Sequence, residues 1–211
     1  MPSQGQAHRT LGRASGPRRA LLRQLVTSLI EHDSITTTYA RAKETQPLIE
    51  KLITHAKDGT TSGRKSVYGF VFNPALSMKK LYDDLALRYR GRTGGYTRLL
   101  HLEPRDRDAA PMAVLEFVGG PKDLRLYLTA KAIARAEVLG KTKLDMATAL
   151  NKRNIEEKMQ NGKELLGEKI ELMKRVYHSG RSSQDALREI SDNAKRRADA
   201  EAFSKTIAKR K

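Results

Sequence analysis

The residues of this chain whose types and spacing could do chemistry are mainly basic. A first group stands near the start, and no carboxylate interrupts it, because the first acid in the sequence is Glu31. Its members are His8, Arg9, Arg13, Arg18, Arg19 and Arg23. Lysine and arginine neutralise phosphates and release condensed counterions, which gives affinity for nucleic acid without base specificity. A solvated tail is the alternative, but five arginines without an acid favour a nucleic-acid-binding arm.

A second basic group flanks a pair of glycines. Its members are Arg88, Arg90, Arg92 and Arg98, around Gly94 and Gly95. Two tyrosines of the same stretch, Tyr89 and Tyr96, could stack on an exposed base, although core or hairpin positions are the commoner role for such residues. The stretch therefore predicts a glycine turn that presents cations. The basic groups at 195–197 and 209–211 are either contacts or solvated helix faces.

The sequence contains little that indicates a catalytic or metal-binding site. The five histidines are scattered and cysteine is absent, which argues against a zinc site. A phosphate-binding loop is not indicated, because Gly162-Lys163 is followed by Glu164 rather than by serine or threonine. Several carboxylates stand among bases and are interpreted as solvated salt-bridge partners: Asp83, Asp84, Glu103 and Glu116. We expect no enzyme activity, no cofactor, no metal and no small-molecule substrate.

The net charge of the chain indicates which class of partner the protein binds. The 211 residues have a formal net charge of +17, and an excess of this size favours a polyanionic partner. An anionic membrane surface is the weaker option, and membrane insertion is not expected, because no run of 18 or more apolar residues exists. The first residues lack the apolar segment of a secretory signal and predict a basic tail. The absence of cysteine fits a reducing or redox-indifferent compartment.

Hydrophobic periodicity predicts the elements that must position the basic groups. A helix over 19–32 bears one apolar face, formed by Leu21, Leu22, Leu25, Val26, Leu29 and Ile30. Residues 34–38 predict a strand or an extended connector, and 39–57 a second helix that Pro47 should bend or divide. Residues 64–72 fit either a short helix or a strand. Residues 73–89 predict a helix.

Two strands and a helical extension complete the prediction. Strands over 96–102 and 112–118, joined by a loop of about ten residues, should pair antiparallel. After Lys122 the chain predicts helices, one marked by Leu124, Leu128, Ala132 and Ala136. The segment 144–177 bears one face of Leu165, Leu166, Ile170, Met173 and Val176, and a further helix is expected over 182–211. The apolar faces of these helices are too narrow to form a core of their own, so the helices are expected to pack on the first domain or on a partner. The fold class is α+β: helices packed on a small antiparallel or mixed sheet, followed by a mostly helical extension.

Three segments together resemble one family. Residues 8–59, RTGGYTR at 92–98 and APMAVLEFV at 110–118 are similar, in order and spacing, to the bacterial-type large-subunit ribosomal protein seventeen family. The resemblance covers about residues 8–118, with a shorter arm than usual. It implies a small protein of α and β elements that binds large-subunit ribosomal RNA near the outer end of the peptide exit tunnel, without catalysis.

The resemblance also implies site residues and a location. The family's basic motif falls on His8, Arg9, Arg13 and Arg18, its helix turn on Lys43 and Glu44, and its glycine turn on Gly94, Gly95, Tyr96 and Arg98. Residues 119–211 have no counterpart in the compact bacterial form. A charged helical extension resembles that of organellar members, notably those of fungal mitochondria. A mitochondrial ribosome is therefore expected, with the bacterial cytoplasm or another organelle as the alternative.

The sequence thus predicts two domains and one function. Residues 1–118, with a basic arm at 1–17, form the ribosomal-RNA-binding domain, and 119–211 form a helical extension that contacts neighbouring large-subunit proteins or RNA. The function is that of a structural constituent of the large ribosomal subunit, supporting its assembly and translation. The alternatives are a free nucleic-acid-packaging or RNA-chaperone protein and, last, a membrane-surface adaptor.

Overall fold

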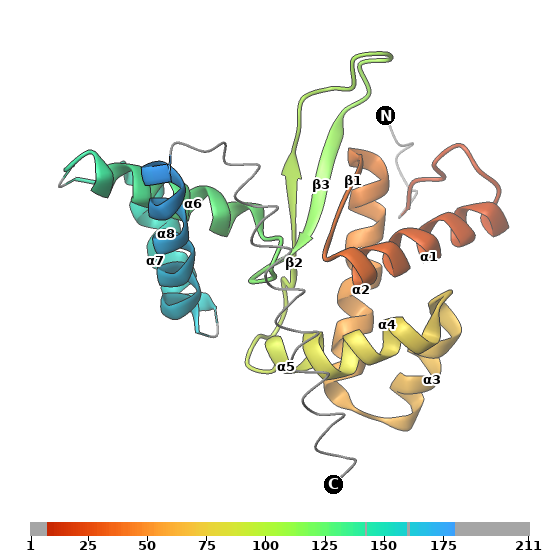
Figure 1. Cartoon of the computed structure of the whole chain (residues 1–211). Coiled ribbons are helices and arrows are strands. Elements are labelled where there is room, and N and C mark those ends of the chain that lie inside the picture. Colours follow the sequence, from red (N-terminus) through yellow and green to blue (C-terminus); the bar gives the residue numbers. More distant parts are fainter. Residues whose placement is uncertain (1–7, 142, 160, 180–211) are drawn as a thin grey trace, which may run out of the picture. The chain divides into compact units, whose positions relative to one another are not determined.

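The computed structural model describes residues 8–141, 143–159 and 161–179 (Figure 1). They form two compact units. The first holds residues 8–126 with Lys158 and Met159, and the second holds 127–157 and 161–179. The helix expected over 182–211 and the basic groups at 195–197 and 209–211 lie outside the described residues.

The first helix, α1 (Ser15–His32), confirms the prediction and begins four residues earlier than expected. Proline is well tolerated in the first turn, so Pro17 does not delay the start. Leu22, Val26, Leu29 and Ile30 are buried, which confirms the apolar face. The C-cap of the helix is Asp33, a left-handed residue whose backbone N–H donates to the Leu29 carbonyl at 2.9 Å.

The second helix, α2 (Tyr39–Asp58), runs through Pro47 without interruption. The expectation that this proline could divide the helix is therefore wrong. Pro47 lacks the N–H that would bond to the carbonyl of Lys43, but both residues are exposed, so water can satisfy that carbonyl.

The next segment resolves an open alternative in favour of a helix. The helix α3 (Thr61–Phe70) is capped by Thr60, whose hydroxyl oxygen accepts a hydrogen bond from the Gly63 N–H at 3.1 Å. The helix expected over 73–89 is confirmed as three consecutive helical segments: α4 (Pro74–Lys80), the π-helical η1 (Leu81–Leu85) and α5 (Ala86–Arg88).

Three strands form one antiparallel sheet. They are β1 (Ser34–Thr38), β2 (Thr97–His101) and β3 (Met112–Phe117), in the order β1-β3-β2. The predicted β2–β3 pairing is confirmed, and 34–38 is a strand. In the register of the sheet, Glu116 lies opposite Arg98 on one side and Ser34 on the other. Figure 1 shows the long loop between β2 and β3 projecting from the end of the hairpin.

One apolar cluster joins the sheet to the helices of the first unit. Its fully buried members include Leu29, Ile30, Ile49, Ile53, Leu81, Leu85, Leu115 and Phe117. They come from α1, α2, η1 and β3, so the sheet and these helices share a single core. The predicted α+β class is confirmed.

The second unit consists of helices. They are α6 (Leu124–Val138), which begins in the first unit, α7 (Met146–Lys158) and α8 (Gly162–Ser179). The segment 144–177 is thus two helices, separated near Asn161, a left-handed residue. Leu166, Met173 and Val176 of the predicted face are buried, whereas Leu165 and Ile170 are only partly buried.

The face expected for α6 is wrong. Leu128 is 52% exposed and Ala132 is exposed, whereas Ala130, Ile133 and Ala134 are buried. Residues four apart are offset by about 40° around a helix, so a stripe repeated strictly every four residues leaves any one face. The helices form one compact unit, in which Lys174 on α8 pairs with Glu137 on α6 at 2.5 Å. The sequence predicted packing on the first domain or on a partner, not a compact unit of these helices.

Candidate nucleic-acid interface

The basic arm is held against α2 by one carboxylate. The guanidinium of Arg18 donates to Glu44 Oε2 at 2.8 Å and, through Nε, to the backbone carbonyl of Arg9 at 2.6 Å. His8 Nδ1 lies 3.7 Å from the same Glu44 oxygen. The Arg9 guanidinium lies 5.9 Å from the ring centroid of Tyr39, at the start of α2. The arm therefore has a defined place, and Arg18 serves mainly to position it.

Three other cations beside this ion pair are unneutralised. Arg13, Arg19 and Lys43 are exposed, and their side chains have no hydrogen bond or ion pair within the described part of the chain. Arg19 adjoins Arg18 along the chain, and Lys43 adjoins Glu44. The Arg18–Glu44 pair thus holds the arm against α2, while the neighbouring unpaired cations are exposed to solvent.

Arg23 has a different environment from the rest of the arm group. Its Nε donates to the Phe70 carbonyl at 2.6 Å, and its guanidinium carbon lies 4.4 Å from the ring centroid of Phe72. These contacts tie α1 to the end of α3. Arg23 therefore has a structural role, unlike the cations of the arm that have no partner.

The glycine turn is anchored at the other end of α2. Gly95 has a φ of +64°, which suits glycine at this turn. Lys57 Nζ donates to the Arg92 carbonyl and to the Tyr96 hydroxyl oxygen, which lies 3.1 Å away. The Tyr96 side chain is 1% exposed and packs on Tyr89, with ring centroids 5.1 Å apart. Both tyrosines are thus core residues here, and their rings are not open to a base.

The arginines around the turn divide in the same way as those of the arm. Arg90 is exposed without a side-chain partner among the described residues, and Arg92 Nε donates to the Gly94 carbonyl at 3.1 Å. Arg88 donates to both oxygens of Asp84, at 2.8 and 2.7 Å. Arg88 on α5 is consequently neutralised by Asp84 on the adjoining η1, whereas Arg90 is free.

Arg98 belongs to a buried network. Its Nη1 donates to Glu116 Oε1 at 3.1 Å and to Asp123 Oδ1 at 2.8 Å, and both carboxylates are inaccessible to solvent. Backbone N–H groups complete the network: Leu124 donates to Glu116, and Gly119 and Leu126 donate to Asp123. Arg98 therefore joins β2 and β3 to the start of α6.

Burial raises the pKa of Glu116 above its ordinary value of 4.5. The Leu124 N–H opposes that rise, the negative charge of Asp123 adds to it, and the Arg98 guanidinium opposes it. The expectation that Glu116 is a solvated partner is therefore wrong, because Glu116 lies on the central strand and its side chain is fully buried. It is a structural element of the sheet, and its protonation state affects folding.

The two basic groups therefore lie at opposite ends of one helix. Residues 43 and 57 are separated by about 21 Å along α2, at a rise of about 1.5 Å per residue. Lys57 was missed by the sequence analysis, since a lone lysine at a helix end has no signal that distinguishes it from a solvated one.

Within the described residues no cluster suited to a metal ion is present, and no helix is long and apolar enough to cross a membrane.

Comparison with known proteins identifies the family. The sequence profile described as ribosomal protein L17 matches residues 21–118. The large ribosomal subunit protein bL17m of Schizosaccharomyces pombe is 44% identical over 177 residues, which cover 82% of this chain and 84% of that protein. The chain belongs to the ribosomal protein L17 family. The bL17m of Neurospora crassa is 45% identical, over 71% of this chain and 76% of that protein.

Bacterial members of the L17 family match a shorter part. The large ribosomal subunit protein bL17 of Lactococcus lactis is 46% identical and 99% covered, but it matches only 53% of this chain. The fungal bL17m proteins match a larger share. This difference confirms the expected resemblance to a fungal, mitochondrial-type L17 protein that carries an extension beyond the bacterial form.

Proposed function

We propose that this L17 family protein is a structural constituent of the large subunit of the mitochondrial ribosome. The similarity to the S. pombe large-subunit protein, over most of both chains, is the observation that supports this role most directly. The protein has no catalytic part in translation. It holds segments of large-subunit ribosomal RNA in place during and after assembly.

The proposed RNA contacts are the cations that the fold leaves free at the two ends of α2. Arg13, Arg19 and Lys43 contact phosphates at one end, and Arg90 does so beside the glycine turn at the other. Phosphate contacts of this kind fix register without reading sequence. Other residues act by position: Glu44, Arg18 and His8 hold the arm, and Tyr96, together with Lys57, holds the turn at Gly94 and Gly95.

The extension has a separate proposed role. Residues 8–126 bind RNA, while the helices that follow contact neighbouring proteins of the large subunit. The extended match to the fungal bL17m proteins supports an added function in their kind of ribosome. The alternative, a free RNA chaperone, shares the charge but gives no reason for the family's glycine turn and strand motif.

Cross-linking in cells tests the RNA assignment. The full chain, tagged and cross-linked to RNA by ultraviolet light, should recover large-subunit ribosomal RNA at a few discrete sites. A variant with Arg13→Gln, Arg19→Gln and Lys43→Gln should lose most of that signal. A variant with Lys141→Gln, Lys163→Gln and Arg175→Gln changes charge equally at exposed positions of the second unit and should retain it. Recovery of many unrelated RNAs would favour the chaperone instead.

A further inference from the structure

Phe72 is a large apolar side chain that the fold holds at the surface. It lies two residues beyond the end of α3 and is 51% exposed, and Tyr68 on α3 is 62% exposed. Neither residue belongs to the predicted arm or to the glycine turn. An exposed aromatic side chain is not unusual alone. What is unusual about Phe72 is that several contacts hold its ring in one position.

Two hydrogen bonds anchor the chain around Phe72 to α1, and a third, within α1, links them. The Phe72 N–H donates to Thr27 Oγ1 at 3.2 Å, and that hydroxyl donates to the Arg23 carbonyl at 2.9 Å. Arg23 Nε donates in turn to the Phe70 carbonyl at 2.6 Å. The Arg23 guanidinium lies over the Phe72 ring, 4.4 Å from its centroid. The ring is thus held in place before any ligand arrives, which lowers the entropic cost of binding to it.

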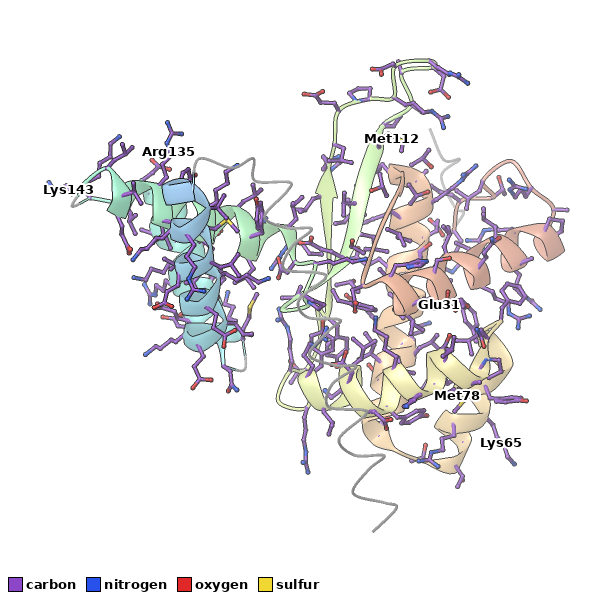
Figure 2. All side chains as sticks on the ribbon, in the orientation of Figure 1. Glu31, Lys65, Met78, Met112, Arg135 and Lys143 are labelled. Carbon is purple, nitrogen blue, oxygen red and sulfur yellow. The ribbon has the colours of Figure 1, made fainter. Side chains whose placement is uncertain are left out.

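The surroundings of the ring are positive. The segment 59–82, which contains α3 and α4, has Arg64, Lys65, Lys79 and Lys80 but no acid. Lys80 is paired with Asp33 at 2.7 Å, so the excess charge comes from the other three. Figure 2 labels Lys65, which projects from α3 at the edge of the first unit. The segment 15–30 of α1 has no acid either. Arg19, one of the free cations, lies one helical turn before Arg23. The aromatic surface is therefore continuous with the proposed RNA contact.

We propose that Phe72 is a stacking platform for an unpaired RNA base. A ligand that suits both the Phe72 ring and the nearby cations needs a flat π surface and an anionic backbone. A nucleotide in single-stranded RNA has both features. The base stacks on the face of the ring that Arg23 leaves open, and the neighbouring cations contact the flanking phosphates. The inference rests on the proposed RNA-binding function and adds to it a specific subsite on the α1–α3 side.

An apolar side chain of a protein partner fits these observations less well. Such a partner would need to bring acids to match the nearby cations, and an aliphatic side chain gains little from the fixed orientation of an aromatic one. The two occupants respond differently to one substitution. Leucine keeps an apolar surface at position 72 but removes the π face on which a base stacks.

The test uses the full chain and a single-stranded RNA of about twelve nucleotides, within the usual site size, that contains 2-aminopurine. Stacking quenches the fluorescence of this base. Phe72→Leu should weaken binding about 5- to 150-fold, the range expected for loss of one base–aromatic stack, and relieve the quenching. Phe72→Tyr keeps the ring and should bind as the wild type does. Thermal unfolding checks that both variants are folded.

Salt titration separates this subsite from the phosphate contacts. Phe72→Leu should leave the dependence of affinity on salt unchanged, whereas Arg19→Gln should reduce its slope by about one. Equal affinity and equal quenching for the wild type and Phe72→Leu would overturn the stacking proposal while leaving RNA binding intact. Failure of the wild type to bind the RNA at all would refute both.

Discussion

At the scale of single residues, six arginines in the described part of the first unit form two groups that the sequence does not distinguish. Arg18, Arg88 and Arg98 are paired with carboxylates, at 2.7 to 3.1 Å. Arg13, Arg19 and Arg90 have no side-chain partner in the described part of the chain. Substitutions in the first group should reduce stability, and those in the second should reduce RNA affinity.

Arg98→Met provides the sharpest test of a structural arginine. It leaves the buried carboxylates of Glu116 and Asp123 without their cation, which should lower the free energy of unfolding by about 3–5 kcal/mol. Urea denaturation followed by tyrosine fluorescence measures the change. Arg90→Met, at an exposed position, is the matched control and should cost less than about 0.5 kcal/mol. Equal losses for the two variants would contradict the network.

Glu116→Gln tests the raised pKa of the buried carboxyl group. The folded protein holds the Glu116 proton to higher pH than the unfolded chain does. The stability that this proton confers is fully present below the unfolded pKa and is lost as pH rises through the raised folded pKa. Unfolding free energies from about pH 4 to about pH 7 should therefore fall for the wild type relative to Glu116→Gln. A difference that stays constant or grows with pH would disprove the assignment.

Local patterns and long-range partners differed in how far the sequence predicted them. The buried face of α1 was correctly predicted, because Leu22, Val26 and Leu29 repeat with the helix period. The role of Arg98 was not, because Asp123 lies 25 positions away and Glu116 lies across a strand pair. Spacing along the chain does not show which cation a folded protein will bury.

At the scale of elements, α2 connects the two parts of the proposed RNA surface. The arm is fixed at Glu44 near its start, and the glycine turn is fixed at Lys57 in its last turn. The predicted elements were mostly right because short β-branched and periodic segments show their type locally. The break between α7 and α8 and the buried face of α6 depend on how helices pack on one another, which the thin stripes do not specify.

The first turn of α6 belongs structurally to the first unit, and truncation tests this. A chain ending at Leu126 keeps Asp123 and the Leu124 N–H and should fold with nearly full stability of the first unit. A chain ending at Gly120 loses both and should be less stable by about 2–5 kcal/mol, the range for removing a partner from a buried charged network. Urea denaturation of the two fragments gives the comparison. Equal stability would show that the network ends with β3.

At the scale of the whole molecule, a net charge of +17 must be balanced by a partner. The compact core of the first unit and the free cations on its surface suit a protein built into a ribonucleoprotein. The second unit adds a helical body that bacterial L17 proteins, covered at 99% of their length by half of this chain, do not require. The central claim is therefore that the protein is an integral part of the large subunit.

Sedimentation of an organelle lysate in high salt tests that claim most directly. Contacts made by a few surface cations with phosphate weaken by orders of magnitude at about half-molar salt. A protein built into the subunit is held by many contacts together, so we predict that the full chain stays with the large subunit under these conditions. Its release to the top of the gradient would contradict the account and identify a peripheral RNA-binding protein.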